Sequence, residues 1–111
     1  MINEKLELPC GVEVKNRFLK SAMTEGLADS DAVANKKHNN LYKKWANGGV
    51  GISVTGNVQI DHRYIERAGN VVIEGEQSNE SLAALADWSH AGTQNNTHLW
   101  MQLSHAGRQT P

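Results

Sequence analysis

The chain has 111 residues, of which 39% are hydrophobic and 21% charged, and its formal net charge is −1. These values are typical of a globular domain or a piece of one, and they exclude a disordered chain. So small a net charge gives no electrostatic basis for binding nucleic acid or an anionic membrane surface. The longest apolar runs are much shorter than the ~20 residues of a membrane-spanning helix. We therefore expect neither a nucleic acid nor a membrane as partner.

Two features of the N-terminal region predict a cytoplasmic location. Residues 1–5 lack the basic start and apolar core of a signal peptide. The single cysteine, Cys10, cannot form an internal disulfide, which favours a reducing cytoplasm. Cys10 lies in a Pro-Cys-Gly turn with no cationic neighbour, so we interpret it as an inert turn residue.

The first elements in chain order are a hairpin and a strand. Residues 5–8 and 12–14 alternate between apolar and polar side chains around the Pro-Cys-Gly turn, which predicts a β-hairpin within residues 1–16. After a polar bend, residues 18–21 form a short apolar stretch that predicts a strand. This strand ends in small and polar residues, among them Thr24.

Two amphipathic helices follow, each before a further strand. The first has an apolar face at His38, Leu41, Tyr42 and Trp45, with lysines on the other side, a cap at Ser30 or Asp31, and an end at residues 47–49. The second is predicted to start at a cap on Ser78 or Asn79. Its expected apolar stripe comprises Leu82, Leu85, Ala86 and Ser89. Trp45 and Trp88 lie on the helices and are expected to pack on the sheet, whereas Trp100 lies within a strand.

The remaining strands indicate a parallel sheet. Residues 50–54 are a nearly continuous apolar run, as in a strand buried on both faces, and the chain stays extended to residue 60. Residues 70–73 and 98–103 are predicted as further strands. The order hairpin–β–α–β–(β)–α–β fits an open doubly wound sheet or the first third of a (β/α)8 barrel. The first strand–helix turn lacks the glycine-rich phosphate motifs, which disfavours a nucleotide-binding open sheet. In either architecture, ligands bind at the carboxyl ends of the strands.

Three segments in register carry a resemblance to a known family. They are LPCGVEVKNR with SAMT (residues 8–17 and 21–24), YKKWANGGVG with TGN (42–51 and 55–57), and WMQLSHAGR (100–108). Together they resemble the Old Yellow Enzyme family of FMN-dependent NAD(P)H:flavin oxidoreductases. The resemblance implies a (β/α)8 barrel closed at its bottom by a hairpin. Residues 1–111 would then be one partial domain, with the hairpin in 1–16 and the first three βα units in 17–111.

The resemblance also implies a cofactor site. Ala22, Met23 and Thr24 would line one side of the flavin ring of FMN, Gly56 would pack close to it, and Gln102 would hydrogen-bond its polar edge. Glycine permits close approach of the backbone, and amide and hydroxyl groups can orient and tune a flavin. His105 and Arg108, at the end of the third strand, are candidates for contacts with substrate or with the residues around it.

This sequence departs from the family pattern near the first strand. The family commonly has Pro in place of Ala22 and often Arg in place of Glu25, and some members have Tyr where this chain has Gly26 and Leu27. We expect these departures to affect contacts with substrate more than flavin binding. No histidines have metal-ligand spacing, so no metal site is expected, and His38, His62 and His90 are interpreted as structural or solvated.

Two hypotheses for function follow. In the family, the residues that anchor substrate and grip the flavin phosphate come after position 111. The first hypothesis is therefore that the chain is the N-terminal part of an enzyme. In that enzyme NAD(P)H would reduce FMN, and FMN would pass hydride to an activated alkene or enone. The second is a non-catalytic module that folds alone or self-associates through open strand edges such as residues 99–103. The partner at those edges would be the rest of the barrel or another chain.

Overall fold

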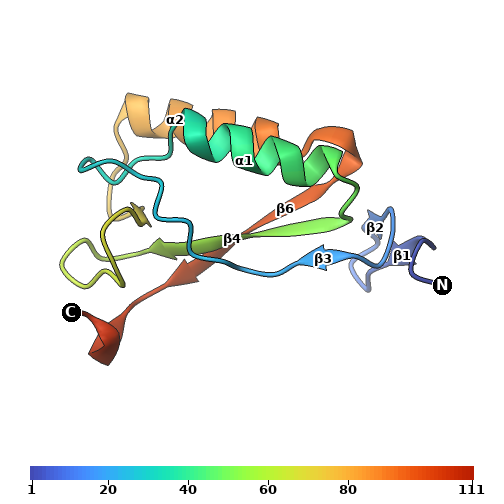
Figure 1. The fold of residues 1–111 in the computed structure, drawn as a ribbon, viewed down its shortest axis with the longest axis horizontal. Helices are drawn as coiled ribbons and strands as arrows, with labels where there is room; N and C mark the ends of the chain where they lie inside the picture. Colours follow the sequence, from blue (N-terminus) through green and yellow to red (C-terminus); the bar gives the residue numbers. More distant parts are fainter.

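The computed structural model describes all 111 residues and shows a parallel sheet with two helices packed along one face (Figure 1). In chain order the elements are β1 (Leu6–Glu7), β2 (Glu13–Val14), β3 (Leu19–Lys20), α1 (Lys36–Asn47), β4 (Ile52–Gln59), β5 (Val71–Val72), α2 (Asn79–Gly92), the 3-10 turn η1 (Gln94–Asn96), β6 (His98–Ser104) and the 3-10 turn η2 (Gly107–Gln109). Neither α-helix is both long and apolar enough to cross a membrane.

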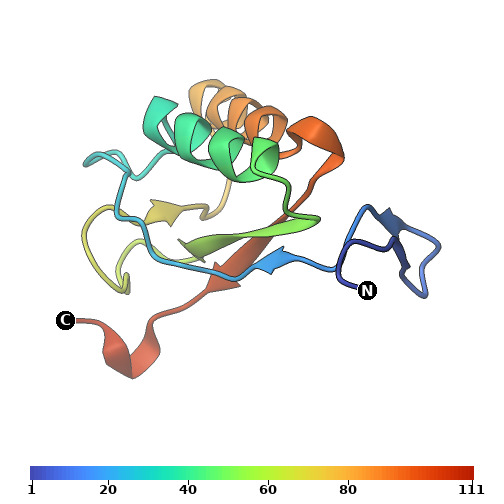
Figure 2. The ribbon, with the colours of Figure 1, turned by 45° about the vertical axis from the view of Figure 1, so that its right-hand side comes forward.

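Strand β4 is the centre of the sheet. It pairs in parallel with β6 over nearly its whole length, while its other edge pairs with β3 near its start and with β5 near its end. The order β3–β4–β6 follows the chain, and α1 and α2 lie on the same side of the sheet in both views (Figure 2). A doubly wound sheet has helices on both faces, so this arrangement is that of a partial (β/α) barrel, as predicted.

The predicted hairpin is present and lies beside the start of β3. It is antiparallel, with Leu6 opposite Val14, and Gly11 takes a φ of +88° that permits the tight turn. Asn16 then fastens the hairpin to the sheet. Its Nδ2 donates to the carbonyl of Gly49 at 2.7 Å, and its Oδ1 accepts from the N–H of Phe18 at 3.0 Å. The hairpin therefore closes the amino-terminal end of the strands, opposite the end where ligands bind in such folds.

Helix α1 begins later than its predicted cap. Its N-cap is Asn35, whose side chain accepts from the N–H of Lys37 at 2.9 Å, while the N–H of Asn35 donates to Nδ1 of His38 at 3.1 Å. The prediction of Ser30 or Asp31 was wrong because Ala32 has a φ of +58°, which turns the chain before a helix can start. Asp31 instead caps this turn by accepting from the N–H of Val33.

Helix α2 is capped by Ser78, one of the two predicted caps, but its buried stripe differs from the predicted one. Leu82 is 53% exposed, whereas Trp88 is 3% exposed, and Ser81, Ala91 and Gly92 are also buried. The stripe is set by tertiary contacts. Trp88 packs against the rings of His38 and Tyr42, with centroid distances of 5.0 Å and 5.3 Å. A Cβ on Gly92 would lie 2.5 Å from the side chain of Leu99, so a larger residue there would require the Leu99 side chain to move.

The core lies between the helices and the sheet. Its buried members are Ala34, Tyr42, Val58, Val71 and Trp88. The predicted strand 50–54 and the extended stretch after it form one strand, β4. The pairing of β4 with β6 is irregular between Val54 and Asn57, where β4 advances three residues while β6 advances two. This β-bulge lies directly before the carboxyl end of β4.

The buried His38, whose ring accepts from the N-cap of α1, predicts acid-sensitive stability. Burial lowers the pKa of His38 below its ordinary value of 6.5, and Asp29 only partly opposes this shift. Below pH 6.5 the His38 ring is therefore protonated in the unfolded chain but largely neutral in the folded chain. The free energy of unfolding then falls as pH decreases toward the lowered pKa. In urea titrations over this range, the free energy of unfolding of wild type should fall by up to about 1.4 kcal/mol per pH unit more than that of His38→Gln. His90→Gln, at an exposed position, should behave as wild type; equal slopes for all three proteins would contradict the prediction.

Candidate functional site

Four side chains form a continuous hydrogen-bonded chain at the carboxyl ends of the strands. Thr24 Oγ1 donates to the carboxylate of Glu66 at 3.2 Å, and Asn57 Nδ2 donates to the same carboxylate at 2.8 Å. Gln102 Nε2 donates to Asn57 Oδ1 at 2.6 Å. The segments after β3 and β4, the end of β4 and the middle of β6 thus meet in one polar row, which we call the strand-end row.

The strand-end row contains two of the five predicted flavin-binding residues. Thr24 is half-buried and Gln102 is exposed, so both are accessible to a ligand. Of the other predicted residues before α1, Ala22 is half-buried and Met23 is 47% exposed. Sequence reasoning missed Asn57 and Glu66. Asn57 could have been found because it follows Gly56 in the TGN segment at a predicted strand end, whereas Glu66 lies in a charged loop that gave no such signal.

Gly56 makes its close approach to this chain's own backbone. A Cβ at this position would lie 2.4 Å from the carbonyl oxygen of Met23 and 3.2 Å from Glu25 Oε1. No side chain larger than hydrogen fits there without a shift of the backbone. Gly56 therefore lets the segment carrying Met23 and Thr24 lie directly against β4, which brings Thr24 within reach of the strand-end row.

Glu25, one of the departures from the family pattern, points into the protein. Its carboxylate accepts from the hydroxyl of Tyr42 at 3.0 Å, and burial raises the pKa of Glu25 above its ordinary value. The sequence predicts only that this departure, with those at Ala22 and at Gly26 and Leu27, affects contacts with substrate. The structure instead places the side chain between the sheet and α1.

His105 and Arg108 lie apart from the strand-end row. The ring of His105 packs against Tyr64 at 5.4 Å, and its Nε2 lies 4.0 Å from Asp61 Oδ2. Its Nδ1 accepts from the N–H of Gly107 at 3.0 Å, which leaves Nε2 as the protonated nitrogen of the neutral ring. Arg108 is exposed on η2. The structure thus joins His105 to the β4–β5 loop, while Arg108 is free to reach solvent or a ligand.

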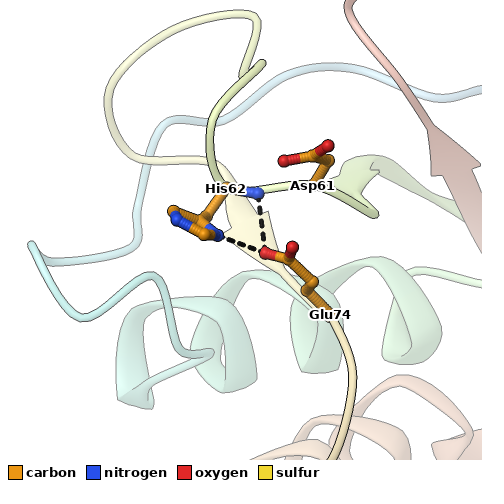
Figure 3. Close-up of side chains that lie close together, drawn as sticks. All are labelled: Asp61, His62 and Glu74. Atoms are coloured by element: carbon orange, nitrogen blue, oxygen red, sulfur yellow. Dashed lines mark hydrogen bonds and ion pairs between the residues drawn. The ribbon is translucent and has the colours of Figure 1, made fainter.

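Asp61, His62 and Glu74 form a second group on this side of the molecule (Figure 3). The N–H and the ring Nδ1 of His62 both bond the carboxylate of Glu74. The carboxylate of Asp61 instead binds Arg63, through Nε at 3.0 Å and Nη2 at 2.8 Å, and these bonds hold the pKa of Asp61 well below its usual range. A cation among these three residues would have to compete with the Arg63 guanidinium. The group is therefore best described as a network of polar contacts that joins the β4–β5 loop to the segment after β5.

The fold and this row define a class: a partial parallel βα barrel with a polar site at the carboxyl ends of its strands. Comparison with known proteins shows which members of this class the chain resembles. No protein-family model matches the chain. The chain is 36% identical over 107 residues to the NADH-dependent flavin oxidoreductase iliE of Hypocrea jecorina (strain QM6a). The matched region covers 96% of this chain and 27% of that relative.

Solved structures have the same fold. The Old Yellow Enzyme from Pichia sp. AKU4542 superposes with a TM-score of 0.84 at 19% identity, covering 98% of this chain and 27% of that chain. Morphinone reductase gives a TM-score of 0.83 at 17% identity, again with 98% and 27% coverage. The chain thus has the fold of Old Yellow Enzyme structures and is similar in sequence to NADH-dependent flavin oxidoreductases, as its three motifs predict. It spans about a quarter of the length of the relatives it matches.

The contact between Gly56 and Met23 predicts a costly substitution. Gly56→Ala places a methyl group against a backbone carbonyl and should lower the free energy of unfolding by about 1–3 kcal/mol, measured by urea denaturation. Gly48→Ala is the matched control, because Gly48 has an ordinary φ of −74° and its Cβ would lie no closer than 3.0 Å to another atom. Equal stabilities of Gly56→Ala and wild type would show that the segment after β3 is not held against β4.

Proposed function

We propose that this chain supplies the ring-facing part of an FMN site in an NAD(P)H-dependent oxidoreductase. The single observation that carries the proposal is the strand-end row, because it joins Thr24, which follows β3, to Gln102 on β6 across the central strand β4, at the end of the barrel where ligands bind. The name of the Hypocrea relative, an NADH-dependent flavin oxidoreductase, supports the same function. An activated alkene or enone is the proposed hydride acceptor.

The residues present fit a flavin by the chemistry of their donors and acceptors. A flavin has a flat apolar body and a polar edge with both carbonyl acceptors and N–H donors. The exposed amide of Gln102 offers both kinds of group to such an edge, and the exposed side chain of Met23 offers an apolar surface to the ring. FMN, when bound, would supply the two-electron redox chemistry.

The hydrogen bonds of the row also determine what each side chain can offer a ligand. Thr24 commits its hydroxyl proton to Glu66, so its oxygen remains an acceptor for an incoming N–H group. Gln102 commits one N–H to Asn57, which fixes the orientation of the amide and leaves its carbonyl oxygen and second N–H for the ligand. We propose that Asn57 and Glu66 thereby orient the two predicted flavin contacts, Thr24 and Gln102.

His105 and Arg108 remain proposed contacts on the substrate side of the site. Both follow β6 at its carboxyl end, and the half-exposed ring of His105 carries a proton donor at Nε2.

A second candidate is a non-catalytic module that associates through its open edges. Strand β6 pairs on one side only, and Trp100, Met101 and Leu103 on it are 44%, 39% and 60% exposed. An exposed apolar edge of this kind pairs readily with another strand, from the rest of a barrel or from a second copy of the chain.

Titration of FMN into the purified chain tests the proposal. FMN fluorescence should be quenched on binding, and Gln102→Ala should weaken the affinity roughly five- to tenfold through loss of a hydrogen bond to the ring. Gln109→Ala, at an exposed position on η2, is the matched control and should bind as wild type.

The same titration separates the two candidates. A wild-type protein that stays colourless after incubation with excess FMN, and that elutes as an oligomer in size-exclusion chromatography, would favour the non-catalytic module. Bound flavin that co-elutes with the protein would exclude it.

A further inference from the structure

A buried polar cluster lies directly beneath the strand-end row. Tyr42 is its centre: the hydroxyl donates to the carboxylate of Glu25 at 3.0 Å and accepts from the backbone N–H of Gly56 at 3.1 Å. Tyr42 is 0% exposed, Gly56 is buried, and Glu25 is half-buried. One hydroxyl group thus bonds both the segment that follows β3 and the backbone of β4.

Lys20 supplies the positive charge of this cluster. It is 6% exposed, its Nζ donates to the carbonyl of Val54, and the ammonium lies 4.9 Å from the ring centroid of Tyr42. Glu25 and Lys20 stabilise each other's charged forms, although burial raises the pKa of Glu25 and lowers that of Lys20. A buried charge without such compensation is strongly destabilising. The cluster therefore holds together as a unit, and removal of one member affects the others.

The place of the cluster in the chain connects it to the site. Glu25 directly follows Thr24, and Gly56 directly precedes Asn57, so both bonds of the Tyr42 hydroxyl end one residue from a member of the strand-end row. Close packing of Gly56 on the Met23 carbonyl joins the same two segments. The ring of Tyr42 is itself fixed by its edge-on contact with the buried Trp88.

We propose that Tyr42 and Glu25 are positioning residues for the flavin site, an inference that rests on the function proposed above. The Tyr42 hydroxyl sets the separation and orientation of the segments that carry Thr24 and Asn57. Glu25 holds that hydroxyl in place, and the Lys20 ammonium favours the charged form of this half-buried carboxylate. Neither Tyr42 nor Glu25 contacts the ligand; both act through the backbone of their neighbours.

Tyr42→Phe tests the proposal, because it keeps the ring and its packing while it removes the hydroxyl. In hydrogen–deuterium exchange without flavin, the amide of Gly56 should exchange about tenfold faster than in wild type, while those of α2 stay unchanged. In an FMN titration, the dissociation constant should rise about tenfold. Tyr64→Phe, at a residue 42% exposed, is the matched control and should change neither result.

Variants of Glu25 give an independent test that does not depend on Tyr42→Phe. Glu25→Gln keeps an acceptor for the Tyr42 hydroxyl and should retain most of the protection of Gly56 and most of the affinity. Glu25→Ala should reproduce both effects of Tyr42→Phe. The same loss for Glu25→Gln and Glu25→Ala would overturn the role assigned to this hydrogen bond.

The outcomes of these experiments separate a positioning role of Tyr42 from a role in stability alone. Unchanged exchange at Gly56 in Tyr42→Phe overturns the proposal. So does a uniform rise in exchange across the chain with an unchanged FMN affinity, since that result indicates a role in stability alone. Failure of wild type to bind FMN would overturn the proposed function of this chain, while the exchange measurements would still decide whether Tyr42 positions the two segments.

Discussion

The side chain of Tyr42 lies where the helices, the sheet and the strand ends meet. Its ring packs edge-on against Trp88 of α2, and its hydroxyl bonds both Glu25 and the backbone of Gly56. Because the ring is fully buried, the apolar packing that stabilises the helices also fixes the position of a polar group at the end of β4. The core and the candidate site are therefore not independent in this chain. A change in how α1 packs on the sheet would be transmitted to Thr24 and Asn57.

Much of the architecture could be predicted from local patterns. The hairpin followed from alternation and a Pro-Cys-Gly turn, and the buried parallel strand followed from the apolar run around Ile52. Both features depend on neighbours in the sequence, which a pattern can report. The choice between an open sheet and a barrel did not follow from such patterns alone. It was decided by the resemblance and by the position of both helices on one face.

The features that could not be predicted depend on contacts between distant residues. The stripe of α2 was misplaced because Trp88, rather than Leu82, faces α1. A lysine in a short strand is usually exposed, yet Lys20 is buried because Glu25 and an aromatic ring compensate its charge. Glu66 joins the strand-end row from a loop more than forty residues after Thr24. No periodicity or local motif in the sequence predicts such a contact between distant residues.

The β-bulge in β4 decides which side of the sheet carries the polar end of this strand. Ser53 pairs with Lys20, whose ammonium reaches the rings of α1, and Thr55 is the next residue on that face. Regular alternation would turn Asn57 to the helices as well. The extra residue shifts the phase, so Val58 packs on Trp88 and Asn57 reaches Gln102 on the opposite face. If the same residues continued in regular alternation without the bulge, the amide of Asn57 would be buried in the apolar core and Val58 would lie on the face of the strand-end row. The polarity of the site thus depends on this local irregularity of β4 as well as on the composition of the strand.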